Sequence, residues 1–310
     1  MRVELLVLAG LVACATRDAT TPPLLHTASP SDGRDAYFEA LGTADYDRLD
    51  GIIDTLQTEA DAGDAVSLAT LGFAHAWRLS EWRRRPDDAN VTDHARWAME
   101  AFDDAVDAVP DDARLVGFRG SFRQATGTIE ERGGLVRRGW FDTVESARRW
   151  PEWGLFTQAY GLVTLEPETR RFEKGITLLW ENLDECADTE VPRENMDWTV
   201  FADRIDDDFD VRACTNTPVA PHNIEGFFFV FGDFYAKKGD LANAKMMYEN
   251  AVAMDDGTWP WRTLTDHRLA TLDTLPDRLN RTYDEDDRPT PEDMLVFGSI
   301  AGCTICHQAE

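Results

Sequence analysis

Residues 227–255 read FFFVFGDFYAKKGDLANAKMMYENAVAMD. Aromatic and small residues recur in this stretch at helical spacing, and they are Phe228, Phe231, Gly232, Tyr235, Gly239, Ala244, Tyr248 and Ala251. The pattern predicts two antiparallel helices joined by a turn at Gly239-Asp240. Small Gly232 and Ala244 would let the helices approach closely, while Tyr235 and Tyr248 would fill the space around them.

This spacing resembles the tetratricopeptide repeat (TPR), a helical hairpin of about 34 residues. A second copy is interrupted, with Leu68, Leu71 and Gly72 in its first helix and Ala98, Phe102, Ala105 and Pro110 in or after its second. Between them, the first helix is predicted to continue through Trp77 and Trp82 into residues 83–86, about fourteen residues longer than the repeat pattern allows.

Apolar residues recur every three or four positions in residues 46–60, 156–165 and 172–186, and no stretch shows sustained strand alternation. Glycines and prolines separate these segments. We therefore expect an all-α fold, a TPR-like helical-hairpin solenoid of roughly three to four helix pairs over residues 33–283.

The start of the chain resembles a bacterial lipoprotein signal. An apolar run at residues 3–13 is too short to span a membrane, and it ends in Leu11-Val12-Ala13-Cys14, which is similar to a lipobox. The resemblance implies a signal peptide at residues 1–13, acylation of Cys14, and a cell-envelope protein attached to the outer membrane or periplasmic face by its lipid anchor alone. Residues 14–32 are predicted to be a disordered tether. A secretory signal with an incidental cysteine is the alternative.

The C-terminal segment, residues 284–310, is predicted to contain an acidic linker and a short helix before Cys303-Thr304-Ile305-Cys306-His307. This run resembles the haem-attachment motif of c-type cytochromes. The resemblance implies haem c bound covalently through Cys303 and Cys306, with His307 as the proximal iron ligand. Candidates for the sixth iron ligand are His222, His267 and Met294.

Two cysteines remain after these assignments, Cys186 and Cys214. In an oxidising compartment we expect them to form a disulfide that closes a loop of roughly thirty residues, worth about 3–4 kcal/mol. Two buried free thiols are the alternative. His75 takes the place of a TPR aromatic residue and is predicted to be packed in the core, while His94 is expected in the inserted loop or at a helix start.

Composition narrows the classes of partner. The 310 residues carry a formal net charge of −27, which repels nucleic acid and anionic lipid and would attract a cationic partner. Adaptation to a salty environment would explain the same charge. No Gly-x-Ser-x-Gly, His-Glu-x-x-His or phosphate-binding glycine loop is present, so no enzymatic activity is predicted.

Three functional hypotheses follow. The first is a lipid-anchored TPR adaptor whose single haem c transfers electrons with a docked, basic redox protein. The second is a haem-free TPR lipoprotein that scaffolds an envelope complex or a transporter component. The third is a thiol-disulfide or metal site made by Cys303, Cys306 and His307, which lacks a βαβ context and an evident fourth zinc ligand.

Overall fold

The computed structural model describes residues 31–42, 45–80, 90–200, 224–255, 257, 259, 261–281 and 295. These ranges contain twelve α-helices and no strand, which confirms the all-α prediction. The helices are α2 (Asp32–Gly42), α3 (Leu49–Asp61), α4 (Ala65–Ser80), α5 (Val91–Ala108), α6 (Ala113–Ile129), α7 (Gly133–Arg149), α8 (Pro151–Tyr160), α9 (Arg170–Ala187), α10 (Ile224–Lys238), α11 (Leu241–Met254), α12 (Arg262–Ala270) and α13 (Leu275–Leu279).

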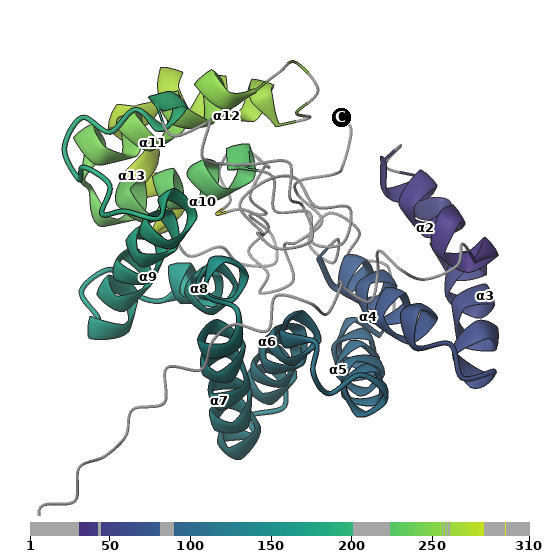
Figure 1. The fold of residues 1–310 in the computed structure, drawn as a ribbon. Helices are drawn as coiled ribbons and strands as arrows, with labels where there is room; N and C mark the ends of the chain where they lie inside the picture. The colour runs from purple at the N-terminus through teal and green to yellow at the C-terminus, as the bar shows by residue number, and fades with distance from the viewer. Residues whose placement is uncertain are drawn as a thin grey trace, which may run out of the picture.

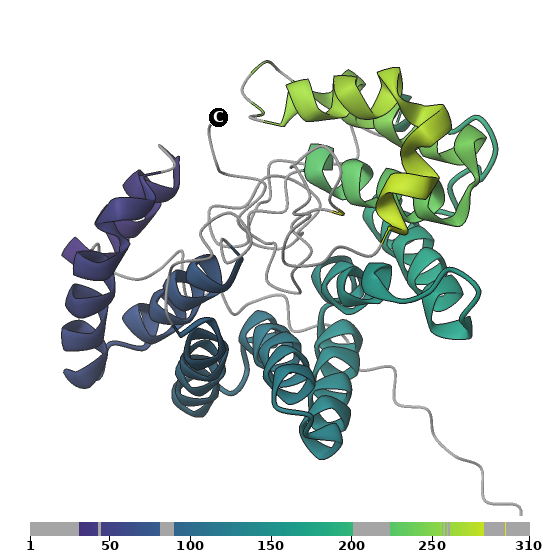
Figure 2. The ribbon, with the colours of Figure 1, turned by 180° about the vertical axis from the view of Figure 1, so that it is seen from behind.

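Successive helices pack as antiparallel pairs that follow one another around an open arc (Figures 1 and 2). Helices α2 and α3 stand at one end of the arc, and α10 to α13 stand at the other. The described part of the chain forms five such pairs, α2/α3 to α10/α11, and the short helices α12 and α13 pack on the last pair. The prediction of three to four pairs was therefore too low.

The hairpin predicted from residues 227–255 is confirmed as α10 and α11. Gly239 takes a φ of +82° at the turn, a conformation that favours glycine, and the Asp240 side chain accepts a hydrogen bond from the backbone N–H of Asn243. A Cβ atom on Gly232 would lie 2.6 Å from Tyr248 Cδ1, so the missing side chain is what lets the tyrosine ring lie against the helix backbone.

The interrupted copy forms α4 and α5. A Cβ atom on Gly72 would lie 2.7 Å from Phe102 Cε2, which repeats the glycine–aromatic contact of α10 and α11. Trp77 lies in α4 and is buried, whereas Trp82 and residues 83–86 lie outside the described residues. Part of the inserted length lies at the start of α5, where seven helical residues precede Ala98, whereas three precede the corresponding Ala244 in α11.

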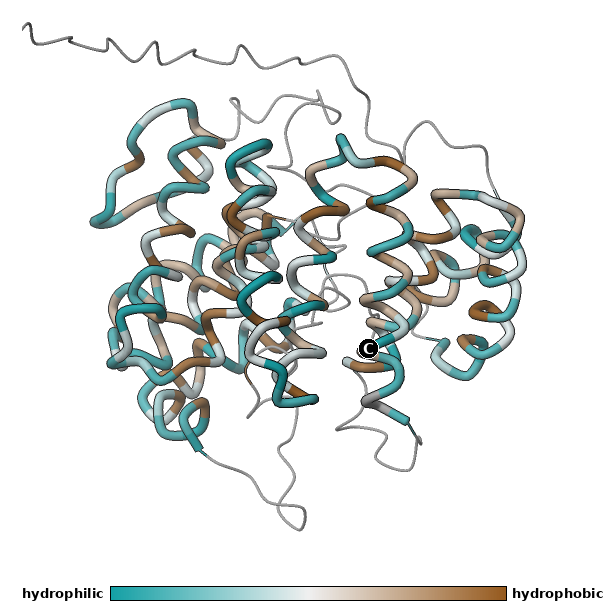
Figure 3. Tube along the Cα trace, turned by 90° about the horizontal axis from the view of Figure 1, so that it is seen from below, coloured by the Kyte–Doolittle hydropathy of each residue, from teal (hydrophilic) through white to brown (hydrophobic). Residues whose placement is uncertain are grey.

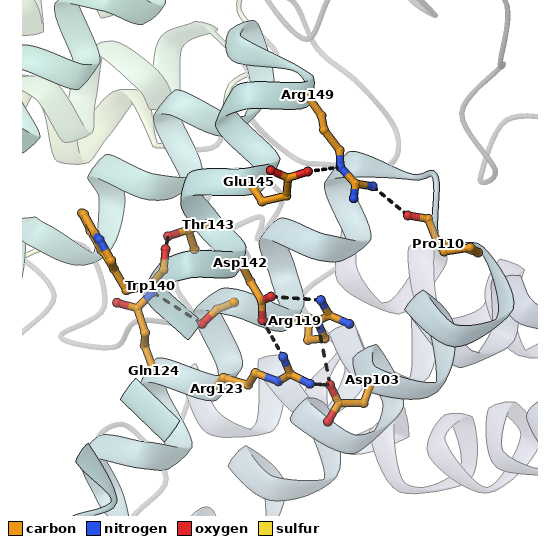
Figure 4. A network of polar contacts seen from close by, with 11 residues as sticks. Asp103, Pro110, Arg119, Arg123, Gln124, Trp140, Asp142, Thr143, Glu145 and Arg149 are labelled. Atoms are coloured by element: carbon orange, nitrogen blue, oxygen red, sulfur yellow. Dashed lines mark hydrogen bonds and ion pairs between the residues drawn. The ribbon is translucent and has the colours of Figure 1, made fainter. Parts of the chain in front are cut away.

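Helices α6 and α7 form a pair that the sequence pattern did not reveal. Their backbones approach closely, because a Cβ atom on Gly120 would lie 2.7 Å from the Gly139 carbonyl oxygen. Two arginines of α6 also bind acidic residues on both neighbouring helices (Figure 4). Arg123 contacts Asp103 of α5 at 2.6 Å and Asp142 of α7 at 2.7 Å, and Arg119 contacts Asp142 at 2.9 Å.

The buried apolar residues divide into two clusters along the arc. One lies among α2 to α6 and includes Trp153 of α8, and the other extends from α8 to α13. Apolar positions recur along each helix and hydrophilic residues gather at turns, as amphipathic helices require (Figure 3). Among the helices that the structure describes, none combines the length and apolarity needed to cross a membrane.

A buried ion pair joins α12 to the last hairpin. Arg268 of α12 lies 3.2 Å from Asp233 of α10, and the two side chains are 0% and 1% exposed. The Tyr248 hydroxyl of α11 donates to the same Asp233 carboxylate at 2.6 Å. Burial and the neighbouring Asp233 charge raise the Tyr248 pKa well above its ordinary value, so the phenol stays protonated and able to donate. The three helices are thus tied through one carboxylate.

Candidate functional site

A groove with a volume of about 840 Å³ lies over α4, between α3 and α5. We call it the α4 groove. Its lining residues are Asp50, Ile53, Asp54, Gln57, Leu68, Leu71, His75, Arg78, Asn90, His94, Trp97, Glu100, Ala101 and Asp104. Both α3 and α5 pack against α4, so one face of α4 forms the floor of the groove and the other two helices form its walls.

Helical periodicity places these residues. On α4, Leu68, Leu71 and His75 follow one another at intervals of three and four residues, which keeps them on one face. On α5, His94, Trp97 and residues 101 and 104 repeat the same intervals. The groove therefore arises where two amphipathic stripes face each other across a helix pair.

Two histidines meet where the α4 floor of the groove joins its α5 wall. His75 is 6% exposed on α4, His94 lies in the first turn of α5, and their Nδ1 atoms are 3.0 Å apart. Burial lowers the His75 pKa to about 3, helped by the nearby positive charges of His94 and Arg78. His75 is consequently a neutral imidazole at neutral pH. One ring of the pair must donate an Nδ1–H to the other.

Trp97 covers the histidine pair from α5. Its ring centroid lies 5.4 Å from that of His75 and 5.0 Å from that of His94. The Trp97 residue remains 40% exposed, which is unusual for so large an aromatic side chain. An exposed indole face beside carboxylates is a suitable surface for a cation.

The groove is acidic. Arg78 is the single lysine or arginine among the described residues that line it, and this guanidinium is bound by Asp50 and donates to the Tyr46 hydroxyl at 2.9 Å. The other three carboxylates are those of Asp54, Glu100 and Asp104, and none of them forms an ion pair within the described residues. The described part of the lining thus carries four carboxylates and one guanidinium, and the guanidinium already pairs with one of the four carboxylates.

Most residues of the predicted site lie outside the described residues. These are Cys14, Cys214, His222, Met294, Cys303, Cys306 and His307. Cys186 is buried near the end of α9 and is disulfide-bonded, and its pairing with Cys214 stays a prediction. His267 of α12 lies 3.3 Å from an Arg278 nitrogen through its Nε2 atom.

The structure confirms that His75 is a core residue and places His94 at a helix start rather than inside the inserted loop. Sequence analysis missed the contact between them, together with Trp97 and the groove carboxylates. A usable signal was present, because Asp50 and Asp54 lie four residues apart on one predicted helix face.

No family model, curated protein sequence or solved structure matches the chain. The observations that bear on its function are therefore the motifs and the geometry of the α4 groove.

Proposed function

We propose that this chain is an extracytoplasmic, lipid-anchored adaptor built of TPR-like hairpins, which carries one covalent haem c and exchanges electrons with a docked redox protein. The observation that carries the proposal is the Cys303-x-x-Cys306-His307 run. Two thiols at this spacing can each bond one haem vinyl group, and the adjacent histidine can ligate the iron. The lipobox-like sequence before Cys14 supports the oxidising compartment in which such haem attachment takes place.

The TPR-like assignment is supported by two helix pairs. In both α4/α5 and α10/α11, a glycine of the first helix receives an aromatic ring from the second, at Gly72–Phe102 and Gly232–Tyr248. Arrays of such pairs commonly present extended binding surfaces and seldom catalyse reactions. An adaptor role fits this architecture better than an enzymatic one.

The α4 groove favours a basic partner. Asp54, Glu100 and Asp104, which form no ion pair within the described residues, place negative charge around the partly exposed Trp97 indole. A lysine or arginine of a docked protein would gain both Coulomb attraction and a cation–π contact there. The net charge of −27 would add long-range steering toward such a partner.

The haem assignment is tested by expressing the full chain with the cytochrome c maturation system and recording its absorption spectrum and intact mass. We expect a Soret band and a haem-sized mass increase, both lost in Cys303→Ala/Cys306→Ala. The matched control is Cys14→Ser, which should keep the haem and lose only the lipid anchor. A colourless wild-type protein of unmodified mass would refute the haem assignment.

That result would leave the second candidate, a haem-free lipoprotein that scaffolds an envelope complex or a transporter component. One observation favours this scaffold role independently of the Cys303-x-x-Cys306-His307 motif. The described helix pairs and the described lining of the acidic α4 groove contain no residue of the C-terminal segment. Its fold and its preference for a basic partner would be unchanged.

Docking is tested with a small basic cytochrome c as the probe, by stopped-flow association at several ionic strengths. Asp54→Asn/Glu100→Gln/Asp104→Asn should slow association roughly tenfold at low salt and flatten its salt dependence. The control removes three exposed carboxylates elsewhere, Glu190→Gln/Asp273→Asn/Asp277→Asn, with the same change in net charge. Equal slowing by both triple variants would show that only overall charge matters, and that the groove is not the docking site.

A further inference from the structure

The contact between His75 and His94 has a second chemical capability. Imidazole nitrogen is the commonest protein ligand for transition metals, and here two such nitrogens from different helices lie 3.0 Å apart at the wall of an open groove. Neither residue belongs to the C-terminal haem motif, so the site is independent of the proposed cytochrome function.

We propose that His75 and His94 form a two-histidine site for a divalent transition-metal ion, which both residues bind through Nδ1, and that Cu²⁺ and Ni²⁺ fit it best.

The nature of the ligands favours particular metals. With metal–nitrogen bonds of about 2.0–2.1 Å, two ligating nitrogens lie about 2.9 Å apart at adjacent corners of a square plane and about 3.3 Å apart in a tetrahedron. The observed 3.0 Å is the length of the hydrogen bond between the rings, so the preference rests on ligand chemistry rather than on this distance. Cu²⁺ and Ni²⁺ favour tetragonal sites of nitrogen and oxygen ligands, and they bind such ligands more tightly than Mn²⁺, Fe²⁺ or Co²⁺ does.

Metal entry requires a small rearrangement. The ring centroids are 5.2 Å apart, so the Nδ1 atoms face each other nearly head-on, as a shared N–H···N hydrogen bond requires. A metal ion would bind when the rings turn until both lone pairs point at one position in the groove. A ring protonated on Nδ1 alone would then carry that proton on Nε2 instead, and a ring protonated on both nitrogens would release its Nδ1 proton to water.

The surroundings support binding of a cation. Asp54, Glu100 and Asp104 make the groove negative. The described residues contain no group of three or more potential metal ligands, so water from the groove would complete the coordination sphere.

The test uses the full chain with Cys303→Ser/Cys306→Ser/His307→Gln, so that the C-terminal motif contributes no ligand. Calorimetric titration with Cu²⁺ and Ni²⁺ at pH 7.5 should show one site per chain. His75→Gln and His94→Gln should each weaken it at least tenfold. His267→Gln is the matched control, because that histidine lies on α12 and contacts Arg278, and it should leave the affinity unchanged.

Electron paramagnetic resonance of the Cu²⁺ form separates a ligand role from a structural one. We expect hyperfine coupling to two imidazole nitrogens, falling to one in each single variant. His94→Gln keeps the proposal testable if loss of the buried His75 unfolds the chain, because His94 is only partly buried at a helix start. An unchanged two-nitrogen signal in His94→Gln, or an affinity equal to that of the parent, would overturn the proposal and leave the pair as a hydrogen bond.

Discussion

The helix pairs α4/α5 and α10/α11 share one packing rule and differ in what covers them. In each, a glycine receives an aromatic ring, Phe102 on Gly72 or Tyr248 on Gly232. The second pair is closed by α12, whose Arg268 is fully buried against α10. The first pair instead opens into the α4 groove, with a partly exposed Trp97. The spacing of small and aromatic residues therefore determines how two helices approach, whereas neighbouring helices determine whether the pair carries a site.

The largest expected loss of stability comes from disrupting the helix pair α10/α11, which α12 covers. Asp233→Ala would leave Arg268 buried without its carboxylate and Tyr248 without its acceptor, and we expect a loss of about 3–5 kcal/mol in the free energy of unfolding. Urea denaturation followed by circular dichroism measures the loss. The double variant Asp233→Ala/Arg268→Met should regain much of it, because neither charge of this ion pair remains.

The control for this experiment is an exposed ion pair on α11. Lys245 and Glu249 lie 3.0 Å apart with side chains 58% and 55% exposed, so Glu249→Ala should cost only about 0.3–0.5 kcal/mol. A similar loss from Asp233→Ala and Glu249→Ala would contradict the view that the buried carboxylate ties the three helices together.

The helix pair α4/α5, which borders the α4 groove, should lose stability in acid. The unfolded chain binds a proton at His75 below pH 6.5, but the folded chain does so only near pH 3. Stability contributed by this residue is therefore complete above pH 6.5 and falls by about 1.4 kcal/mol per pH unit below it. His75→Phe removes this dependence while keeping an aromatic ring.

The pH effect is measured as the difference in the free energy of unfolding between wild type and His75→Phe. Urea denaturation at pH 6.5, 5.5 and 4.5, with a chelator present, gives both values. Titration of the many carboxylates is common to both proteins and cancels in the difference. A difference that does not change with pH would show that the folded protein can protonate His75 without cost, and the site would have to be more hydrated than its 6% exposure indicates.

The sequence predicted the hairpins best where both partners of a contact belong to one repeat. Gly232 and Tyr248 are sixteen positions apart and conform to a known spacing, so α10 and α11 were predicted with their turn. Helices α6 and α7 escaped prediction because Gly120 contacts the Gly139 backbone, and such a contact requires no aromatic partner that a pattern could reveal.

The α4 groove could not be predicted from the sequence for a related reason. His75 was predicted to be buried, but its partner His94 lies across the inserted segment, whose length gives no register between α4 and α5. The Asp54 wall comes from a third helix. A site assembled from three helices depends on interhelical distances, which periodicity within each helix does not supply.

The smallest expected change in stability comes from substituting alanine for the glycine of each pair, which compares the two glycine contacts directly. Alanine at position 232 would place Cβ 2.6 Å from Tyr248 Cδ1, and alanine at position 72 would place it 2.7 Å from Phe102 Cε2. Overpacking costs about 1–3 kcal/mol, against a gain in helix propensity of about 1 kcal/mol. We expect Gly232→Ala to destabilise by about 1–2 kcal/mol and Gly72→Ala by less, because the Tyr248 hydroxyl is held by the Asp233 carboxylate, whereas the Phe102 ring has no polar group to hold it.

The propensity gain is isolated by Gly51→Ala on α3, where a Cβ atom meets nothing within 4 Å. This variant should be more stable than wild type by about 0.5–1 kcal/mol in the same urea measurement. If Gly72→Ala proved as stabilising as Gly51→Ala, the aromatic contact in the open pair would impose no constraint, and the shared packing rule would apply only where a neighbouring helix fixes the ring. If Gly72→Ala proved as costly as Gly232→Ala, both rings would be equally fixed, and the hydrogen bond from Tyr248 to Asp233 would have no effect on the glycine contact.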